Sequence, residues 1–411
     1  MDSTNTSLTA EGLNAELRKH VIYPTIFVGI EACLAFIGNF AVLSVFFFRY
    51  NVSNFRYFVL CLSFLDFIST FTTMTGEMIT EHYWYIYPMK FQWFCKTKSF
   101  CNMFTVTAEA FCLCAIAADR FRKVCRPFSW QIKPPQAIKI CGVIYILAIV
   151  VAFPVPFFWG VHSYNRIENG VAIHVTVCEK DQLYLDTAVH GHYIKFLLVF
   201  MPIILMVTLF LYICIAVKMY RRRAERKAKT YTSPDCKRNA SSNMKSLTFT
   251  ANGLPNGTSI FIQEEKLSDT GTGNNVLEDN NSQSNDVCDG VVKVNLDVPG
   301  RRQRLQDSES SSRVQTSRRV RKKTIIMVIL TFVFSITVIE YLTCLATVAH
   351  KNDVLPSMSN SGKAAFFFAL RLVFINHVIN PLVIFFFDRQ FRKGIISLKS
   401  SVLEKIFFCN K

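Results

Sequence analysis

The residues from Cys95 to Pro127 read CKTKSFCNMFTVTAEAFCLCAIAADRFRKVCRP, a mostly apolar run that ends in Asp119, Arg120 and a basic, proline-terminated segment. As an α-helix, the part from Cys95 to Arg120 would be about 38 Å long, enough to cross a bilayer from face to face. A charged pair where such a helix meets water is costly unless its side chains have a partner or a task. Arg120 could be a simple anchor to lipid headgroups, so the pair alone leaves anchoring and function open.

The composition of the whole chain indicates a membrane protein. Its 411 residues are 51% hydrophobic and 14% aromatic, with 38 Phe, which is too apolar for a typical soluble protein. The formal net charge of +17 could suggest a nucleic-acid partner, but the excess Lys and Arg lie between apolar blocks. That placement favours a topological meaning and no nucleic acid. Many of the fourteen cysteines lie inside apolar runs, and no pair has the spacing of zinc ligands.

Apolar stretches long enough to span a membrane predict the fold. They lie at 21–48, 56–79, 97–124, 138–159, 193–219, 324–348 and 364–387. The sequence therefore predicts an all-α membrane protein, a seven-transmembrane helix bundle over residues 21–395. Residues 1–20 form a short outer N-terminus without the apolar core of a cleavable signal peptide, so the first span must direct insertion. Residues 396–411 form a tail.

Basic residues gather in alternate connections, which sets the expected orientation. They are Arg49 and Arg56; Arg122, Lys123, Arg126, Lys133 and Lys139; Arg221, Arg222, Arg223, Arg226 and Lys227 with Arg318, Arg319, Arg321, Lys322 and Lys323; and Arg389, Arg392 and Lys393. The positive-inside rule places these segments in the cytosol. We therefore expect a plasma-membrane protein with an extracellular N-terminus and a cytosolic C-terminus.

Residues 220–322 differ from the spans in composition. They are rich in Ser, Asn, Asp, Gly and Thr, which predicts a long, largely disordered third cytosolic loop with helical basic ends. Of the Asn-x-Ser/Thr sequons, only the one at Asn5 lies on the predicted outer side, so Asn5 is the candidate glycosylation site.

Several short motifs along these spans agree with one another in order and spacing. They are Gly38-Asn39, Leu62-Ser63-Phe64-Leu65-Asp66, Trp93 and Cys95, Asp119-Arg120-Phe121, Cys125-Arg126-Pro127, Pro202, Asn376-His377-Val378-Ile379-Asn380-Pro381 and Phe387-Asp388-Arg389-Gln390-Phe391-Arg392-Lys393. Together with seven spans, they resemble a rhodopsin-like (class A) G protein-coupled receptor. The last motif resembles that family's short amphipathic helix along the inner leaflet, with Phe391 expected to face lipid. A receptor of this kind is not an enzyme.

The resemblance implies roles for polar residues in the membrane. In the family, the acid matching Asp66 binds sodium, here with Asn39, Glu109, Asn376 and Asn380 as candidate ligands; we expect no other cofactor. Glu109 stands where the family commonly has a small hydroxyl. Two such close carboxylates would share a proton or hold a cation tightly, or Glu109 is simply protonated and hydrogen-bonded.

The resemblance also assigns residues at the two ends of the bundle. Cys95 is expected to pair with Cys178 in an oxidising compartment. At rest Arg120 should pair with Asp119, and in the active state the segment Asp119, Arg120 and Phe121 should face a heterotrimeric G protein. Cys409 is a candidate for palmitoylation, although it lies some distance beyond the amphipathic helix.

The sequence also departs from the family pattern. Ile384 and Phe210 stand where the seventh and fifth spans usually carry tyrosine, and Val338 and Glu340 replace the sixth span's usual tryptophan and proline. These departures leave two readings open: a receptor that activates a G protein, and a ligand-binding receptor that no longer couples. A transporter or a channel fits less well, because no internal repeat and no re-entrant segment stands out.

The outer half of the bundle should bind the ligand. Asn102 stands where amine receptors carry an acid, and Phe374 where opsins carry the retinal lysine, which argues against both ligands. The candidate ligand contacts are Glu77, Asn102, Met103, Glu340, Tyr341, Phe366, Arg371 and Phe374. Glu340 and Arg371 could instead pair with each other. The run from Asp119 to Pro127 is similar to that of invertebrate neuropeptide receptors, so we expect a short neuropeptide, with a lipid or other small molecule as the alternative.

The Lys and Arg distribution predicts a testable topology. An epitope tag within residues 220–322 should be reachable by antibody only after permeabilisation, and a tag before Asn5 should be reachable on intact cells. Antibody labelling of the loop tag on intact cells would contradict the seven-span arrangement.

Overall fold

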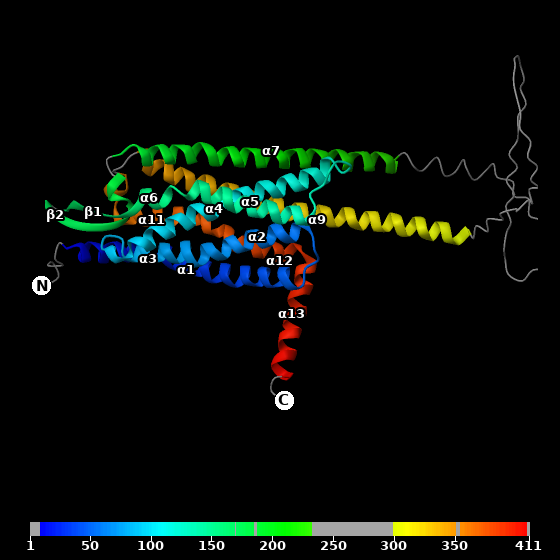
Figure 1. Cartoon of the computed structure of the whole chain (residues 1–411), viewed down its shortest axis with the longest axis horizontal. Helices are drawn as coiled ribbons and strands as arrows, with labels where there is room; N and C mark the ends of the chain where they lie inside the picture. The colour runs from blue at the N-terminus through cyan, green and yellow to red at the C-terminus, as the bar shows by residue number, and fades with distance from the viewer. Residues whose placement is uncertain (1–8, 169, 185–186, 232–298, 351–353, 409–411) are drawn as a thin grey trace, which may run out of the picture. The chain divides into compact units, whose positions relative to one another are not determined.

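The computed structural model describes residues 9–168, 170–184, 187–231, 299–350 and 354–408, and helices make up most of this part of the chain (Figure 1). Seven helical segments within it are long and apolar enough to cross a membrane, which confirms the predicted spans. They are Ala10–Phe48, Asn54–His82, Met89–Cys125, Pro134–Phe158, Val189–Glu225, Lys322–Thr347 and Asn360–Phe387.

The first span is a single long helix, α1 (Ala10–Phe48), which begins well before residue 21. The hydroxyl of Thr9 caps it by accepting a hydrogen bond from the Gly12 backbone nitrogen at 3.1 Å. The amide of buried Asn14 donates to the His82 carbonyl at 3.0 Å and accepts from the Tyr85 backbone nitrogen at 3.0 Å. The residues before the predicted span are therefore held against the outer end of the bundle.

The second and seventh spans are each interrupted. A π-helical turn, Thr70–Met74, separates α2 (Asn54–Ser69) from α3 (Thr75–His82). A 3₁₀ turn, Leu372–Phe374, separates α11 (Asn360–Arg371) from α12 (Ile375–Phe387). Such interruptions often mark functional positions. Here they place the polar middle of the bundle directly beside a break in each of two helices.

The third, fourth, fifth and sixth spans complete the bundle. They are α4 (Gln92–Cys125), α5 (Pro134–Ala152) with the short α6 (Val155–Phe158), α7 (Val189–Tyr231) and α9 (Pro299–His350); α10 (Val354–Ser357) precedes α11. Prolines 134 and 135 open α5, where their missing N–H groups would be unpaired in any case.

A glycine sets the distance between α1 and α12. A Cβ atom on Gly38 would lie 2.5 Å from Cγ of Pro381, so only glycine allows this approach. The neighbouring Asn39 donates its amide to the His377 carbonyl at 2.9 Å. The Gly38-Asn39 motif thus joins the first span to the middle of the seventh.

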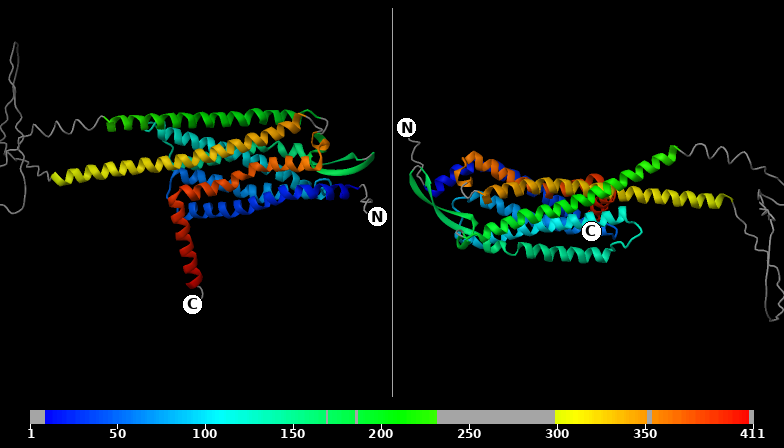
Figure 2. Two further views of the ribbon diagram at one scale, coloured as in Figure 1. Left: turned by 180° about the vertical axis from the view of Figure 1, so that it is seen from behind. Right: turned by 90° about the horizontal axis from the view of Figure 1, so that it is seen from above.

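A β-hairpin covers the outer end of the bundle, on the same side as the N-terminus (Figures 1 and 2). Strands β1 (Trp159–Glu168) and β2 (Val171–Lys180) pair antiparallel, from Trp159 opposite Lys180 to Glu168 opposite Val171. Gly170 has φ of 81°, which favours glycine at the turn. We did not predict this hairpin, although Asn169-Gly170 between two apolar runs is a strong hairpin signal.

The hairpin is held by packing and by a covalent bond. Ile173, Val175 and Val177 alternate along β2 and are buried in one cluster with Leu17 of α1 and Phe367 of α11. Cys178 forms the predicted disulfide with Cys95 of α4, with the two Cα atoms 5.9 Å apart. The second outer connection is therefore fixed to the first, third and seventh spans.

The final helix, α13 (Arg389–Phe408), lies across the bundle at the end opposite the hairpin (Figures 1 and 2). Its existence after the seventh span was predicted, but the expectation that Phe391 faces lipid is wrong. Phe391 is 2% exposed, and its ring centroid lies 5.9 Å from that of Phe46. Tyr50 donates to Asp388 at 2.7 Å and aligns this junction, so the first turn of α13 packs inward on α1.

Some predictions fall wholly or partly outside the described residues. The predicted loop includes 232–298, and only its ends are described: α7 continues to Tyr231 and α9 begins at Pro299, in agreement with helical basic ends. Asn5 and Cys409 also lie outside, so glycosylation and palmitoylation stay predictions.

The disulfide gives a prediction that uses non-additivity. Changing either Cys95 or Cys178 to Ser should lower the amount of receptor at the cell surface to a similar degree, because each change breaks the same bond. The double variant should lose little more. Surface labelling of intact cells measures this, with Cys101→Ser, which alters a free cysteine of α4, as the control. Additive losses would argue against the pairing.

Candidate functional site

The C-terminal part of α4 carries Asp119 and Arg120, and both side chains are buried. Asp119 Oδ2 lies 3.0 Å from Arg120 Nη2, so the expected ion pair is present. The same oxygen contacts Lys123 Nζ at 2.9 Å, and Oδ1 accepts from the amide of Asn54 at 2.7 Å. Asp119 is thus bound from two helices and by two cations. Sequence reasoning missed Asn54 and Lys123 as its partners.

The fifth span, α7, carries a buried tyrosine, but not at the position usual in the family. Phe210, at the family's tyrosine position, is 63% exposed, whereas Tyr212, two residues later, is buried. The hydroxyl of Tyr212 accepts a hydrogen bond from Thr331 of α9 at 3.3 Å. The fifth span therefore lacks the hydroxyl at position 210, as predicted, but offers a buried tyrosine hydroxyl two residues later. Ile384 is buried in the core.

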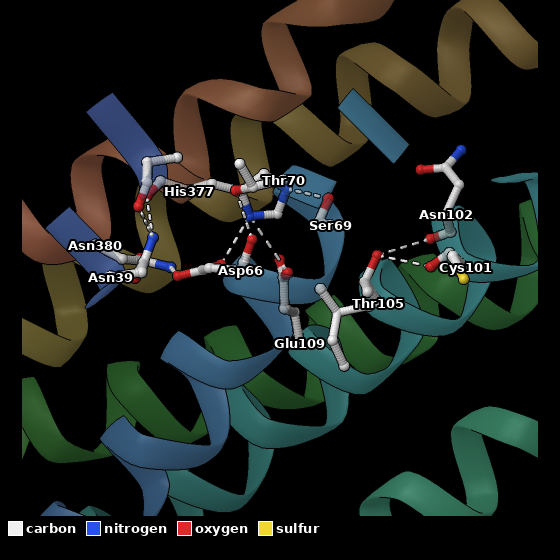
Figure 3. Close-up of polar contacts among 12 residues, drawn as sticks. Asn39, Asp66, Ser69, Thr70, Cys101, Asn102, Thr105, Glu109, His377 and Asn380 are labelled. Atoms are coloured by element: carbon white, nitrogen blue, oxygen red, sulfur yellow. Dashed lines mark hydrogen bonds and ion pairs between the residues drawn. The ribbon is translucent and has the colours of Figure 1, made fainter. Parts of the chain in front are cut away.

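The middle of the bundle contains a cluster of three buried ionisable residues, Asp66 of α2, Glu109 of α4 and His377 of α12 (Figure 3). His377 Nδ1 lies 2.7 Å from Asp66 Oδ1 and 3.5 Å from Glu109 Oε1. Asn380 donates to the other Asp66 oxygen at 2.8 Å. The structure thus brings Asp66, Glu109 and Asn380 together as the sodium prediction requires.

The same cluster is a poor fit to a sodium ion. Sodium, like other hard cations, is bound by oxygen atoms with free lone pairs. Both Asp66 oxygens already face side-chain nitrogens, and His377 Nδ1 lies near both carboxylates. The amide nitrogen of Asn39 donates to the Ala35 and His377 carbonyls. Asn376 is buried, but its role as a ligand stays a prediction.

The outer end contains a second buried charge network. Arg371 of α11 contacts Glu77 at 2.7 Å and Glu81 at 2.9 Å, both on α3. Lys98 of α4 contacts Glu77 at 3.0 Å, and Thr25 of α1 donates to Glu81 at 2.7 Å. The two acids and two bases thus join α3, α4 and α11, and Thr25 adds α1 to the network. The suggested Arg371–Glu340 pair is wrong, because Arg371 is engaged by α3 and Glu340 accepts from Cys344 at 3.3 Å.

A narrow pocket opens between α4, α7 and α9, beside this network. Its lining is Asn102, Met103, Val106, Leu197, Met201, Val338, Tyr341, Leu342 and Leu345. Three predicted contacts, Asn102, Met103 and Tyr341, meet here, and Asn102 donates to the Tyr341 hydroxyl at 3.2 Å. Val338 lines the pocket at the family's tryptophan position, so the smaller side chain helps to form the space.

The other candidate contacts lie elsewhere. Phe366 packs at the edge of the cluster under the hairpin, and Glu340 is on α9 one residue before Tyr341. Phe374 is buried, and its ring stacks on His377 with centroids 6.0 Å apart. Phe374 therefore supports the central cluster, and its contact with ligand stays a prediction.

Besides Asn54 and Lys123, the sequence reasoning did not select His377, Glu81, Lys98 and Glu179 as site residues. His377 stands inside the motif used for the resemblance, and Glu81 follows Glu77 by one helical turn, so both carried a signal. Glu179 follows the disulfide cysteine on β2, outside the membrane spans. Burial raises the pKa of its carboxyl group to about 7, while the charge of Lys98 opposes this rise.

Residues 38–383 match the family model of the seven-transmembrane receptors of the rhodopsin family. The chain belongs to this family. A rhodopsin-family chain is a receptor and not an enzyme, and its apolar helices make it a multi-pass membrane protein. The matched region includes the central cluster and the Asp119–Arg120 pair.

Individual relatives in the rhodopsin family are distant. The chain is 27% identical over 209 residues to the pyrokinin-1 receptor of Drosophila melanogaster, covering 49% of this chain and 43% of that protein. It is 28% identical over 183 residues to bombesin receptor subtype-3 of Ovis aries, covering 41% of this chain and 42% of that protein. It is 28% identical over 213 residues to the D(1C) dopamine receptor of Xenopus laevis, covering 50% of this chain and 42% of that protein. The matches span less than half the length of these relatives.

The outer charge network predicts a large effect of removing Arg371. Arg371→Met leaves Glu77 and Glu81 facing each other in a buried site, so we expect a loss of about 3–5 kcal/mol in stability. Lys19→Met is the control, because it removes a cation from an exposed ion pair, Lys19–Glu16 at 2.6 Å, where little stability is at stake. Thermal unfolding of the purified receptor measures both. Equal shifts in the two variants would show that the network does not hold the helices together.

Proposed function

We propose that the chain is a plasma-membrane receptor that binds a short extracellular peptide and activates a heterotrimeric G protein. The observation that carries the proposal is the buried Asp119–Arg120 ion pair at the cytosolic end of α4. A buried arginine beside basic, cytosol-facing connections is positioned to exchange its internal partner for a protein partner. The N-terminus and the hairpin would then face the outside.

The bonding of Asp119 supports a restrained resting state. Asp119 accepts from Asn54 and contacts Arg120 and Lys123, so the side chain of Arg120 is held against α4. Arg120 Nε has no hydrogen-bond acceptor among the described residues. A G protein segment that supplies acceptors for the guanidinium group would therefore compete with Asp119 for Arg120.

The alternative reading, a receptor that no longer couples, rests on the substitutions at Ile384, Phe210 and Val338. Tyr212 weakens part of this argument, because it gives α7 a buried hydroxyl that contacts α9. Ile384 offers no hydroxyl from α12. An exchange assay decides between the two readings.

The outer surface favours a peptide over an amine. Asn102, which lacks the negative charge that an ammonium ligand needs, faces Tyr341 in the pocket. Glu77 and Glu81 are neutralised internally by Arg371 and Lys98. The hairpin adds an extended surface, and peptide receptors occur among the relatives. We infer that an apolar side chain of the peptide enters the narrow pocket. A lipid or other small apolar molecule is the alternative occupant.

Coupling can be tested before the ligand is known. Asp119→Asn should raise basal nucleotide exchange on a purified heterotrimeric G protein, because it weakens the restraint on Arg120. An interaction of about 1 kcal/mol corresponds to about a fivefold change in population. Adding Arg120→Ala to Asp119→Asn should remove this exchange. Arg126→Ala, which removes a charge from an exposed residue near the same end of α4, is the matched control.

Surface labelling on the same variants separates loss of coupling from loss of folding. Exchange that persists in the Arg120→Ala double variant would refute the role given to Arg120. If no heterotrimer in a representative panel responds to Asp119→Asn, the non-coupling reading is the better one.

A further inference from the structure

The most unusual feature of the central cluster is that a histidine ring lies where the resemblance predicts an ion. We propose that the imidazole of His377, whose Nδ1 lies near both Asp66 and Glu109, takes the place of sodium at this site, so that the folded receptor does not bind sodium there. The proposal depends on the family membership and on the cluster's geometry, and it does not depend on the ligand or on G protein coupling.

The first argument is the direction of the hydrogen-bond donors. Asp66 Oδ1 faces His377 Nδ1 at 2.7 Å, and Asp66 Oδ2 accepts from Asn380 Nδ2 at 2.8 Å. Each carboxylate oxygen therefore meets a nitrogen within hydrogen-bonding distance. A sodium ion at Asp66 would have to displace at least one of these contacts. The carboxylate of Asp66 is already satisfied by protein groups.

The second argument is charge. Glu109 Oε1 is buried and has no hydrogen-bond donor within the described residues, and His377 Nδ1 lies 3.5 Å from it. Glu31 of α1 is buried as well and lies near enough to His377 for an electrostatic interaction. Carboxyl groups from three helices thus surround one imidazole. In a low-dielectric interior, a positive group at this position stabilises whichever of them is ionised.

The third argument is that the ring is fixed in place. Ser69 Oγ lies 3.0 Å from Nε2, so both ring nitrogens have partners (Figure 3). Phe374 stacks on one side of the ring. The His377 carbonyl accepts from Asn39 of α1 at 2.9 Å, which holds the backbone that carries the ring. The ring therefore cannot leave its place beside the carboxylates without breaking its contacts to Asp66 and Ser69 of α2.

A side chain such as His377 and a bound sodium ion stabilise the folded receptor in different ways. A sodium ion stabilises the state that binds it only in proportion to its concentration. The His377 contacts join α2, α4 and α12 at any salt composition. The stability of this receptor should therefore be independent of sodium, which is the property that the test measures.

The experiment compares thermal unfolding of the purified full-length receptor in sodium chloride and in N-methylglucamine chloride at equal ionic strength. Unfolding is followed by the reaction of the buried cysteines Cys61, Cys112 and Cys141 with a thiol-reactive dye. The wild-type Tm should be the same in both salts. A wild-type Tm that rises with sodium would overturn the proposal directly, whatever the variants do.

The decisive variant is His377→Ser, which removes the ring and leaves a hydroxyl oxygen beside two carboxylates. Its Tm should be lower than that of the wild type without sodium, and sodium should raise it by about 3–5 °C at about ten times the dissociation constant. Val383→Ala is the matched control, because it empties space at a buried position of the same helix without adding an oxygen ligand. Its loss of Tm should be equal in both salts.

Two further results would also overturn the proposal. A folded His377→Ser receptor that is insensitive to sodium would show that the ring does not occupy an ion position. A fall in the wild-type Tm on adding a transition-metal chelator would show that Asp66, Glu109 and His377 together hold a metal ion.

Discussion

A charge inside a membrane protein must be neutralised by a partner close by, because the surroundings offer little solvation. This constraint explains more of the bundle than its apolar packing does. At the hairpin end Arg371 and Lys98 neutralise Glu77 and Glu81, in the middle His377 lies against Asp66 and Glu109, and at the opposite end Arg120 and Lys123 contact Asp119. The first two groups each join at least two helices, and Asn54 of α2 links the third group to a second helix through its hydrogen bond to Asp119. Apolar contacts alone would allow these helices to slide or rotate with little change in energy, whereas the charged pairs fix their register.

Local departures from regular helix make these pairs possible. The π-helical turn after Asp66 and the 3₁₀ turn before His377 change the direction of side chains on two neighbouring spans. Gly38 brings α1 close enough for Asn39 to reach the His377 carbonyl. The hairpin and the Cys95–Cys178 disulfide fix the outer end of α4, which carries Lys98. The irregular features of the bundle are therefore concentrated where its charges have to meet.

The sequence was sufficient for the spans, the disulfide and the helix after the seventh span, because each depends on a local pattern or on a motif with fixed spacing. It also identified the residues of the central cluster, with the exception of His377. It failed where the answer depends on which way a side chain points. Phe391 was placed on the lipid side, but the orientation of α13 is set by Tyr50 and Asp388, which only the fold brings together. The suggested pairing of Arg371 with Glu340 is wrong for the same reason. The partners of Arg371 lie on α3, and the π-helical turn in the second span, which precedes α3, is not visible in the sequence.

The helix α4 connects the three charge groups along the bundle. Lys98, Glu109 and Arg120 are spaced at intervals of eleven residues, which is close to three helical turns, so their side chains share one face of α4 about 16 Å apart. All three are buried. Lys98 contacts Glu77 of α3, and Glu109 lies near His377 of α12. Arg120 contacts Asp119 of α4 itself, and Asp119 accepts a hydrogen bond from Asn54 of α2. A rotation of α4 about its axis would strain the contacts of Lys98 and Glu109 with other helices and the Asn54–Asp119 hydrogen bond at once. Because these contacts lie at three levels of one helix, they fix both the rotation and the height of α4 in the bundle.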